Sequence, residues 1–76
     1  MSAAEIAALS QAEFDTLAVG TPMRRIGYHG LRRNACLSLG ATRARNSEAL
    51  LQGLATDPSP LVRQAATWAL GRVREG

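Results

Sequence analysis

Residues Leu31–Gly40 read LRRNACLSLG, and residues Leu61–Gly71 read LVRQAATWALG. When their closing glycines are aligned, both stretches follow the pattern R-x-x-A-x-x-x-L-G, 31 positions apart. A short helical hairpin cannot bury its apolar face alone, whereas stacked copies of one hairpin share a continuous core. The shared alanine lets neighbouring helices approach closely, and the shared leucine fills the space between them. The doubled pattern therefore predicts an α-solenoid.

Capping signals predict short helices before the first copy of the pattern. Ser2 and Ser10 are each followed three residues later by a glutamate, which is the capping box of a helix start. The second of these helices is expected to end at Gly20. Thr21-Pro22 then begins another short turn, since proline suits the first helical position. The leading helix of the first hairpin is therefore expected to be displaced or broken.

Glycines predict the limits of the helix that carries the first copy. Gly27 and Gly30 indicate a tight link before it, so the helix is expected over Leu31–Leu39. Gly40 stands where a left-handed residue would end the helix. The segment ATRARN that follows is read as a polar link.

The second hairpin has clearer signals. Ser47 is expected to cap a helix with the sequence EALLQGLA. All residues of the TDPSP segment that follows are typical of turns. Ser59 then caps a helix in which Pro60 takes the first place and which runs from Leu61 to about Arg74. No segment alternates as a strand. The fold class is therefore predicted to be all-α, with four to five short helices.

Length and composition indicate one small folded domain over residues 1–76. It divides into leading helices and a turn over 1–27, and two repeat-bearing helices with an intervening helix over 28–76. The chain is 46% hydrophobic and 20% charged, as folded domains are. No apolar run reaches the roughly 20 residues of a membrane span. Cys36 is the only cysteine, so an internal disulfide is excluded and a cytoplasmic location is expected.

Charge is segregated along the chain. All nine basic residues are arginines, and the net charge is +3. Residues 1–20 carry three acids and no arginine, whereas residues 21–45 carry six arginines and no acid. Such a block marks a surface for an anionic partner. The alternative is that arginine merely supplies solvated cations to the surface.

The second copy and its preceding turn, DPSPLVRQAATWALG, resemble the short HEAT-like repeat of phycocyanobilin-lyase-type proteins. A wider resemblance covers Leu9–Val73. The segments LSQAEF, GTPMRRIGYHGLRRNACLSLG and DPSPLVRQAATWALGRV resemble, in order and spacing, the C-terminal part of epoxyqueuosine reductases. The chain is therefore expected to be the tail of a longer protein.

This resemblance implies a cobalamin-dependent iron–sulfur oxidoreductase of queuosine biosynthesis, which acts on tRNA. Its preceding domains would hold the cobalamin and two [4Fe–4S] clusters, and its HEAT-like tail would help to cradle the tRNA anticodon arm. The cysteine runs that bind such clusters are absent from this chain. The tail is thus expected to be non-catalytic, without a metal or small-molecule site, and to contact tRNA and the catalytic domain.

Candidate RNA-binding residues lie in the acid-free block. Guanidinium groups suit phosphate oxygens bidentately, and periodicity does not force four of the arginines inward. The expected phosphate contacts are therefore Arg24, Arg25, Arg43 and Arg45. Arg33, beside Asn34, is expected to face either tRNA or the catalytic domain.

For the other residues that the sequence singles out, we expect either one of two alternative roles or a purely structural role. Tyr28 is expected either to stack on an unpaired base or to anchor its loop on the core. Arg32 and Arg63 occupy the arginine position of the repeat and are expected to join neighbouring segments through Asp57. We further expect Trp68 and Cys36 in the core, His29 without a role, and two arginines near a helix C-terminus, Arg72 and Arg74.

A second function remains open. Most HEAT-like repeats bind proteins, so the chain is alternatively a protein-interaction adaptor whose concave face binds an acidic segment of a partner. Cluster cysteines encoded upstream in the same reading frame would favour the reductase tail over the adaptor.

Overall fold

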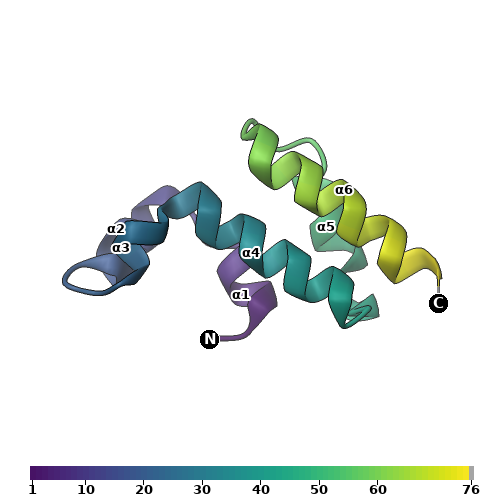
Figure 1. Cartoon of the computed structure of the whole chain (residues 1–76), viewed down its shortest axis with the longest axis horizontal. Helices are drawn as coiled ribbons and strands as arrows, with labels where there is room; N and C mark the ends of the chain where they lie inside the picture. Colours follow the sequence, from purple (N-terminus) through teal and green to yellow (C-terminus); the bar gives the residue numbers. More distant parts are fainter. Residues whose placement is uncertain (76) are drawn as a thin grey trace.

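A computed structural model describes residues 1–75, which form six α-helices, one 3-10 helix and no strand (Figure 1). The all-α prediction is confirmed, although the helices outnumber the expected four to five because residues 1–27 are broken into three pieces. No helix in this range is long and apolar enough to cross a membrane. The elements are α1 (Ala3–Ala7), α2 (Gln11–Ala18), α3 (Met23–Ile26), α4 (Tyr28–Ala41), η1 (Arg45–Ser47), α5 (Glu48–Leu54) and α6 (Pro60–Glu75).

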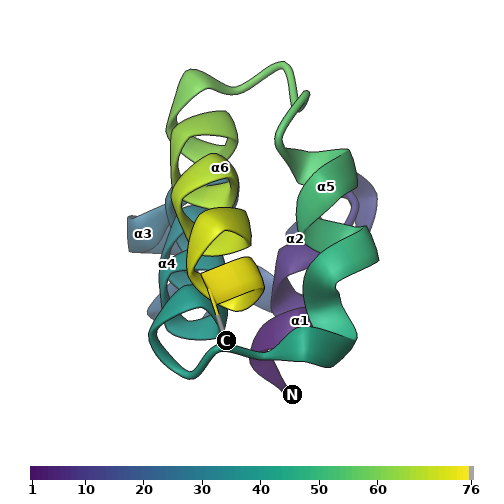
Figure 2. The same cartoon turned by 90° about the vertical axis from the view of Figure 1, so that its right-hand side faces the viewer.

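The helices form two stacked hairpins. The two long helices, α4 and α6, pack against each other over the largest interface in the molecule. Helix α1 packs on α4, and α5 packs on α6, so that the two short helices form a second layer beside the two long ones (Figure 2). Helices α2 and α3 extend from one end of this body (Figure 1). The leading helix of the first hairpin is thus the five-residue α1, displaced along the chain by α2 and α3.

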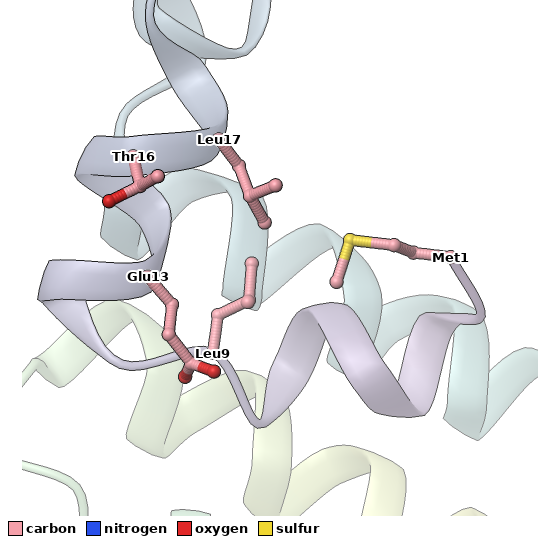
Figure 3. Close-up of a pocket in the computed structure, with 5 residues that line it drawn as sticks. All are labelled: Met1, Leu9, Glu13, Thr16 and Leu17. Atoms are coloured by element: carbon pink, nitrogen blue, oxygen red, sulfur yellow. The ribbon is translucent and has the colours of Figure 1, made fainter.

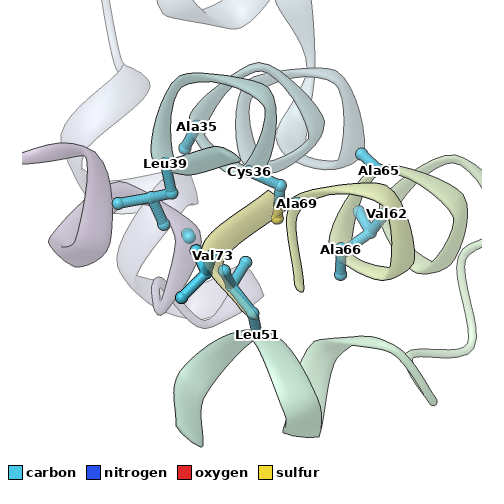
Figure 4. Close-up of a cluster of buried hydrophobic side chains, with 10 residues drawn as sticks. Ala35, Cys36, Leu39, Leu51, Val62, Ala65, Ala66, Ala69 and Val73 are labelled. Atoms are coloured by element: carbon cyan, nitrogen blue, oxygen red, sulfur yellow. The ribbon is translucent and has the colours of Figure 1, made fainter. Parts of the chain in front are cut away.

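The core lies between the two layers. Small side chains dominate it (Figure 4), so the backbones of α4 and α6 approach closely. Leu39 is buried as expected, whereas Leu70 is only partly buried. The buried cluster consists of Ala7, Ala35, Cys36, Leu39, Leu51, Val62, Ala65, Ala66, Ala69 and Val73.

Gly40 does not end its helix. Helix α4 begins at Tyr28, contains Gly30 and continues through Gly40, so the predicted link at Gly30 and left-handed end at Gly40 are wrong. A Cβ on Gly40 would lie 2.6 Å from Trp68 Cζ3 and 2.8 Å from the Cα of Ala69. Gly40 is therefore required by the close approach of α4 to α6.

Helix α4 ends at Ala41, and the left-handed residue that follows it is Arg43. The N–H of Arg43 donates to the Gly40 carbonyl, and the N–H of Ala44 donates to the Leu39 carbonyl, which is the Schellman arrangement. Arg43 takes the left-handed conformation that this motif requires, with φ of 50°. Glycine is favoured there, because a Cβ makes this conformation unfavourable by about 1 kcal/mol. An arginine thus occupies a position that favours glycine.

The predicted caps are mostly confirmed. Ser2 and Ser10 each form both hydrogen bonds of a capping box, and the bonded glutamates have a lowered pKa because the cap N–H groups donate to them. Pro60 is the first residue of α6, and Ser59 Oγ accepts from the Val62 N–H at 3.5 Å. Ser47 precedes α5, but its side chain does not cap the helix.

Candidate nucleic-acid interface

Arg32 lies inside the molecule and has several partners. Its side chain is 6% exposed, and its Nη1 and Nη2 lie 2.9 and 3.3 Å from the two carboxylate oxygens of Asp57. Nη2 is also 3.0 Å from His29 Nδ1, so His29 does have a contact. The guanidinium lies over the Tyr28 ring, 4.1 Å from its centroid. Arg32 is therefore a junction residue and has little surface to offer a ligand.

Asp57 is the other half of this junction. Its Oδ2 also accepts from the Ser59 N–H at 3.0 Å, and its carbonyl accepts from Arg63 Nη1 at 3.0 Å. Hydrogen bonding from Arg32 is the main reason that the pKa of the Asp57 carboxyl is lowered. The α5–α6 turn is thereby tied to α4 through Arg32 and to α6 through Arg63.

Tyr28 contacts the leading helices. Its hydroxyl donates to the carbonyl of Leu9, and its ring centroid is 5.7 Å from that of Phe14. Because Arg32 lies over the same ring, these contacts favour the anchoring role. Stacking of a base on Tyr28 stays a prediction.

The remaining arginines of the acid-free block are exposed. Arg33 donates only to the neighbouring Asn34 Oδ1, at 3.2 Å. Within residues 1–75, four of these arginines have no ion pair with a carboxylate: Arg24, Arg25, Arg33 and Arg45. Arg25 lines a polar hollow of about 360 Å³ together with Gly20, Thr21 and Pro22. These guanidinium groups are accessible to an anionic partner.

The exposed arginines are distributed along α4. Arg24 and Arg25 lie on α3, which precedes α4, and Arg43 and Arg45 follow the end of α4. Helix α4 has 14 residues. At a rise of about 1.5 Å for each residue, it separates the two pairs by about 20 Å. Arg33 lies on α4 between them, so the structure does not gather the predicted phosphate contacts into one cluster.

Arg43 differs from the other candidates because it has an acidic neighbour. Its Nη2 lies 3.6 Å from Glu75 Oε2, and Arg72 Nη1 lies 3.6 Å from the same oxygen. In the last turn of α6, where Arg72 and Arg74 were expected, Arg74 Nε lies 3.5 Å from Glu48. Such exposed pairs contribute only about 0–1 kcal/mol, so a phosphate group can replace the carboxylate.

Trp68 is not a core residue, contrary to the prediction, because its side chain is 47% exposed. The buried stripe of α6 passes through Val62, Ala65, Ala66, Ala69 and Val73. Residue 68 lies beside that stripe, one step before Ala69, and its ring covers Gly40 of α4. The signal in the sequence was the helical period itself, which places position 68 outside the stripe.

The residues of this chain do not fit an iron–sulfur cluster. A [4Fe–4S] cluster requires four thiolate ligands, and Cys36 is the only cysteine. It is fully buried, as predicted, and burial raises the pKa of its thiol. Within residues 1–75 there is no group of three or more His, Cys, Asp or Glu side chains that could hold a metal ion.

Comparison with known proteins gives two matches. The family model for HEAT repeats matches residues 29–75. An epoxyqueuosine reductase of Alicycliphilus denitrificans is 40% identical over a 77-residue alignment, which covers 91% of this chain and 21% of that protein. The chain thus spans about a fifth of the length of this curated relative. No solved structure matches it. The match over residues 29–75, together with the two stacked hairpins, shows that the chain belongs to the HEAT repeat family.

Proposed function

We propose that this HEAT-repeat domain is a non-catalytic, tRNA-binding part of an epoxyqueuosine reductase-like enzyme. The observation that carries the proposal is the acid-free block over residues 21–45, in which five of six arginines are exposed. The similarity to an epoxyqueuosine reductase supports the choice of enzyme and of tRNA as the polyanion. Contacts to phosphate and sugar would orient the tRNA with little base specificity.

The division of labour follows from the residues. Cobalamin and iron–sulfur clusters would supply the redox chemistry, and they would be held by other parts of the longer protein. This chain would contribute exposed guanidinium groups at both ends of α4 and at Arg33. Their spacing of about 20 Å suits an extended nucleic acid better than a single small anion.

The backbone of Arg43 supports a role for that side chain. Residues in unfavourable conformations cluster at functional sites, where the side chain rather than the fold selects the residue. Arg43 has a positive φ, and its only carboxylate partner within residues 1–75 is the exposed Glu75. Glycine would satisfy the backbone better but would remove the cation.

Binding of tRNA to the chain across a salt series tests the proposal. If four arginines neutralise phosphates, the logarithm of the association constant should fall against the logarithm of salt concentration with a slope of about −3 to −4. Filter binding from low to physiological salt gives this slope. A flat response, or no binding at low salt, would contradict the proposal.

A second candidate function, a protein-interaction adaptor, is favoured by a different region. An apolar groove of about 330 Å³ lies beside α2, lined by Met1, Leu9, Glu13, Thr16 and Leu17 (Figure 3). The side chains of Met1 and Leu17 are largely exposed. Such a groove suits an apolar protein segment, for example one from the catalytic domain.

The adaptor is tested by Leu17→Ser. The catalytic part of the related A. denitrificans reductase, supplied separately, should bind the wild-type chain and lose affinity for the variant in calorimetry. The adaptor function would be favoured if this binding occurred while tRNA failed to bind. Equal binding of wild type and variant would exclude the groove as the docking site.

A further inference from the structure

We propose that Trp68, Arg72 and Arg43 form a site for one unpaired nucleotide. Its base would stack on the indole, and its phosphate would lie between the two guanidinium groups. This inference rests on the proposed function for the identity of the ligand as RNA. It adds a second candidate base contact, after Tyr28, to a domain whose other candidate contacts are to phosphate.

The indole of Trp68 contacts the neighbouring helix and remains partly exposed to solvent. Its Cζ3 lies 2.6 Å from the position that a Cβ of Gly40 would take, so the ring contacts α4 at Gly40. About half of the side chain nevertheless remains in water. Two turns earlier on α6, Leu61 is also exposed, at the same helical face. An aromatic ring that contacts the backbone of a neighbouring helix and is about half exposed can serve as a platform for a base.

Tyr28 shows what a closed aromatic site looks like in this chain. Its hydroxyl is bonded to Leu9, and the Arg32 guanidinium lies 4.1 Å from its ring centroid. At Trp68 the corresponding guanidinium, that of Arg72, lies 5.7 Å from the ring centroid. Because Arg72 lies farther from its ring, an outward movement of this side chain alone would let a base stack on Trp68. Trp68 is thus a better stacking residue than Tyr28.

Within the described part of the chain, Arg72 has an unpaired hydrogen-bond donor. Its Nε is buried and has no hydrogen-bond partner within residues 1–75. An unsatisfied buried donor is unfavourable, and a bound phosphate could accept from this group once the side chain turned outward. Its Nη1 contacts Glu75 at 3.6 Å, which is longer than a good charged hydrogen bond.

Charge favours a nucleotide over an apolar peptide at this surface. Two guanidinium groups, those of Arg43 and Arg72, share the carboxylate of Glu75, so these three side chains carry one net positive charge. Arg72 places this cluster next to the indole. A nucleotide presents both an aromatic face and a negative phosphate, and arginine beside an aromatic ring binds such units. The left-handed Arg43 holds one of these cations at the end of α4.

The wild-type chain reports on this site directly, because Trp68 is its only tryptophan. Hexauridylate should quench the tryptophan fluorescence in a saturable way, whereas polyphosphate of similar charge should not. Quenching by hexauridylate but not by polyphosphate supports stacking of a base on Trp68. The proposal is contradicted if hexauridylate leaves the fluorescence unchanged, or if polyphosphate quenches it equally.

Variants separate stacking from charge. Trp68→Leu should weaken hexauridylate binding about tenfold in fluorescence anisotropy, since the variant loses the stacking of one base. Trp68→Phe should retain much of the affinity, and Arg72→Gln should lose several-fold. Val19→Ser, which removes an exposed apolar side chain elsewhere, is the matched control and should change nothing. Circular dichroism of each variant verifies that it is folded.

The outcomes distinguish this site from the function on which it rests. If tRNA binds with the expected salt slope but hexauridylate neither quenches nor responds to Trp68→Leu, the nucleotide site is wrong and the proposed function stands. If neither RNA binds, the proposed function is wrong. If Trp68→Leu instead abolishes self-association in sedimentation, the surface belongs to a second copy and the nucleotide site is overturned.

Discussion

Arg32 and Arg33 are adjacent in the sequence but lie in different environments. Arg32 is buried, forms an ion pair with Asp57, contacts His29 Nδ1 and lies over the ring of Tyr28. Arg33 lies about 100° further round α4. It contacts only the side chain of Asn34 and is otherwise in water. The comparison separates the arginines that build the junction between hairpins from those that remain available to a ligand.

The largest expected effect is the loss of the buried arginine. Arg32→Ala leaves the Asp57 carboxylate largely buried without its main partner. This change should lower the free energy of unfolding by about 3–5 kcal/mol, whereas Arg33→Ala should change it by less than about 0.5 kcal/mol. Urea unfolding of the two variants measures the difference. Similar stabilities for both would contradict the division into junction and surface.

The repeated glycines provide a second matched pair. Gly40→Ala places a Cβ 2.8 Å from the backbone of Ala69. Such overpacking should destabilise the fold by about 1–3 kcal/mol. The Cβ added by Gly71→Ala would meet no neighbouring atom, and the residue lies inside α6. Because alanine favours the helix more than glycine does, this change should stabilise the fold by up to about 1 kcal/mol. Thermal unfolding compares them. A neutral Gly40→Ala would show that the two helices are not in close contact.

Arg43 should show opposite effects on stability and binding. Arg43→Gly relieves the left-handed backbone and loses only an exposed ion pair, so it should raise stability by up to about 1 kcal/mol. The same change should weaken tRNA binding because it removes a cation. Unfolding and filter binding of this one variant measure both effects. Unchanged affinity would remove Arg43 from the interface.

The smallest expected effect is a pH dependence at the junction. The pKa of Asp57 is lowered in the folded state from its ordinary value of 3.8, mainly by the hydrogen bond from Arg32. Its contribution to stability is therefore present above the unfolded pKa and is lost as the pH falls through the folded pKa. Wild-type stability should decrease below about pH 4 more steeply than that of Asp57→Asn. Parallel pH profiles for the two proteins would argue against this contribution.

Local signals predicted much of the fold. The capping boxes at Ser2 and Ser10 and the proline at the start of α6 depend on neighbouring residues only, and they occur as expected. Gly40 was misread because its neighbour is distant in the sequence. Nothing local distinguishes a glycine that ends a helix from one that admits Trp68 of another helix.

The candidate site was less predictable for the same reason. The sequence identified the acid-free block, but the position of Glu75 beside Arg43 depends on how α6 lies against the end of α4. Trp68 was assigned to the core from its alanine neighbours, although the helical period placed it outside the buried stripe. Tertiary contacts, rather than residue type, determine which aromatic side chain is exposed to solvent.

The central claim is that the exposed arginines bind tRNA without supporting the fold. Charge reversal of Arg24, Arg25, Arg43 and Arg45 to glutamate, measured by filter binding at low salt beside circular dichroism, tests it most directly. The account predicts loss of tRNA binding by a chain that remains helical and unfolds cooperatively. Full binding by the folded variant would contradict the claim, and unfolding of the variant would show that these arginines support the structure.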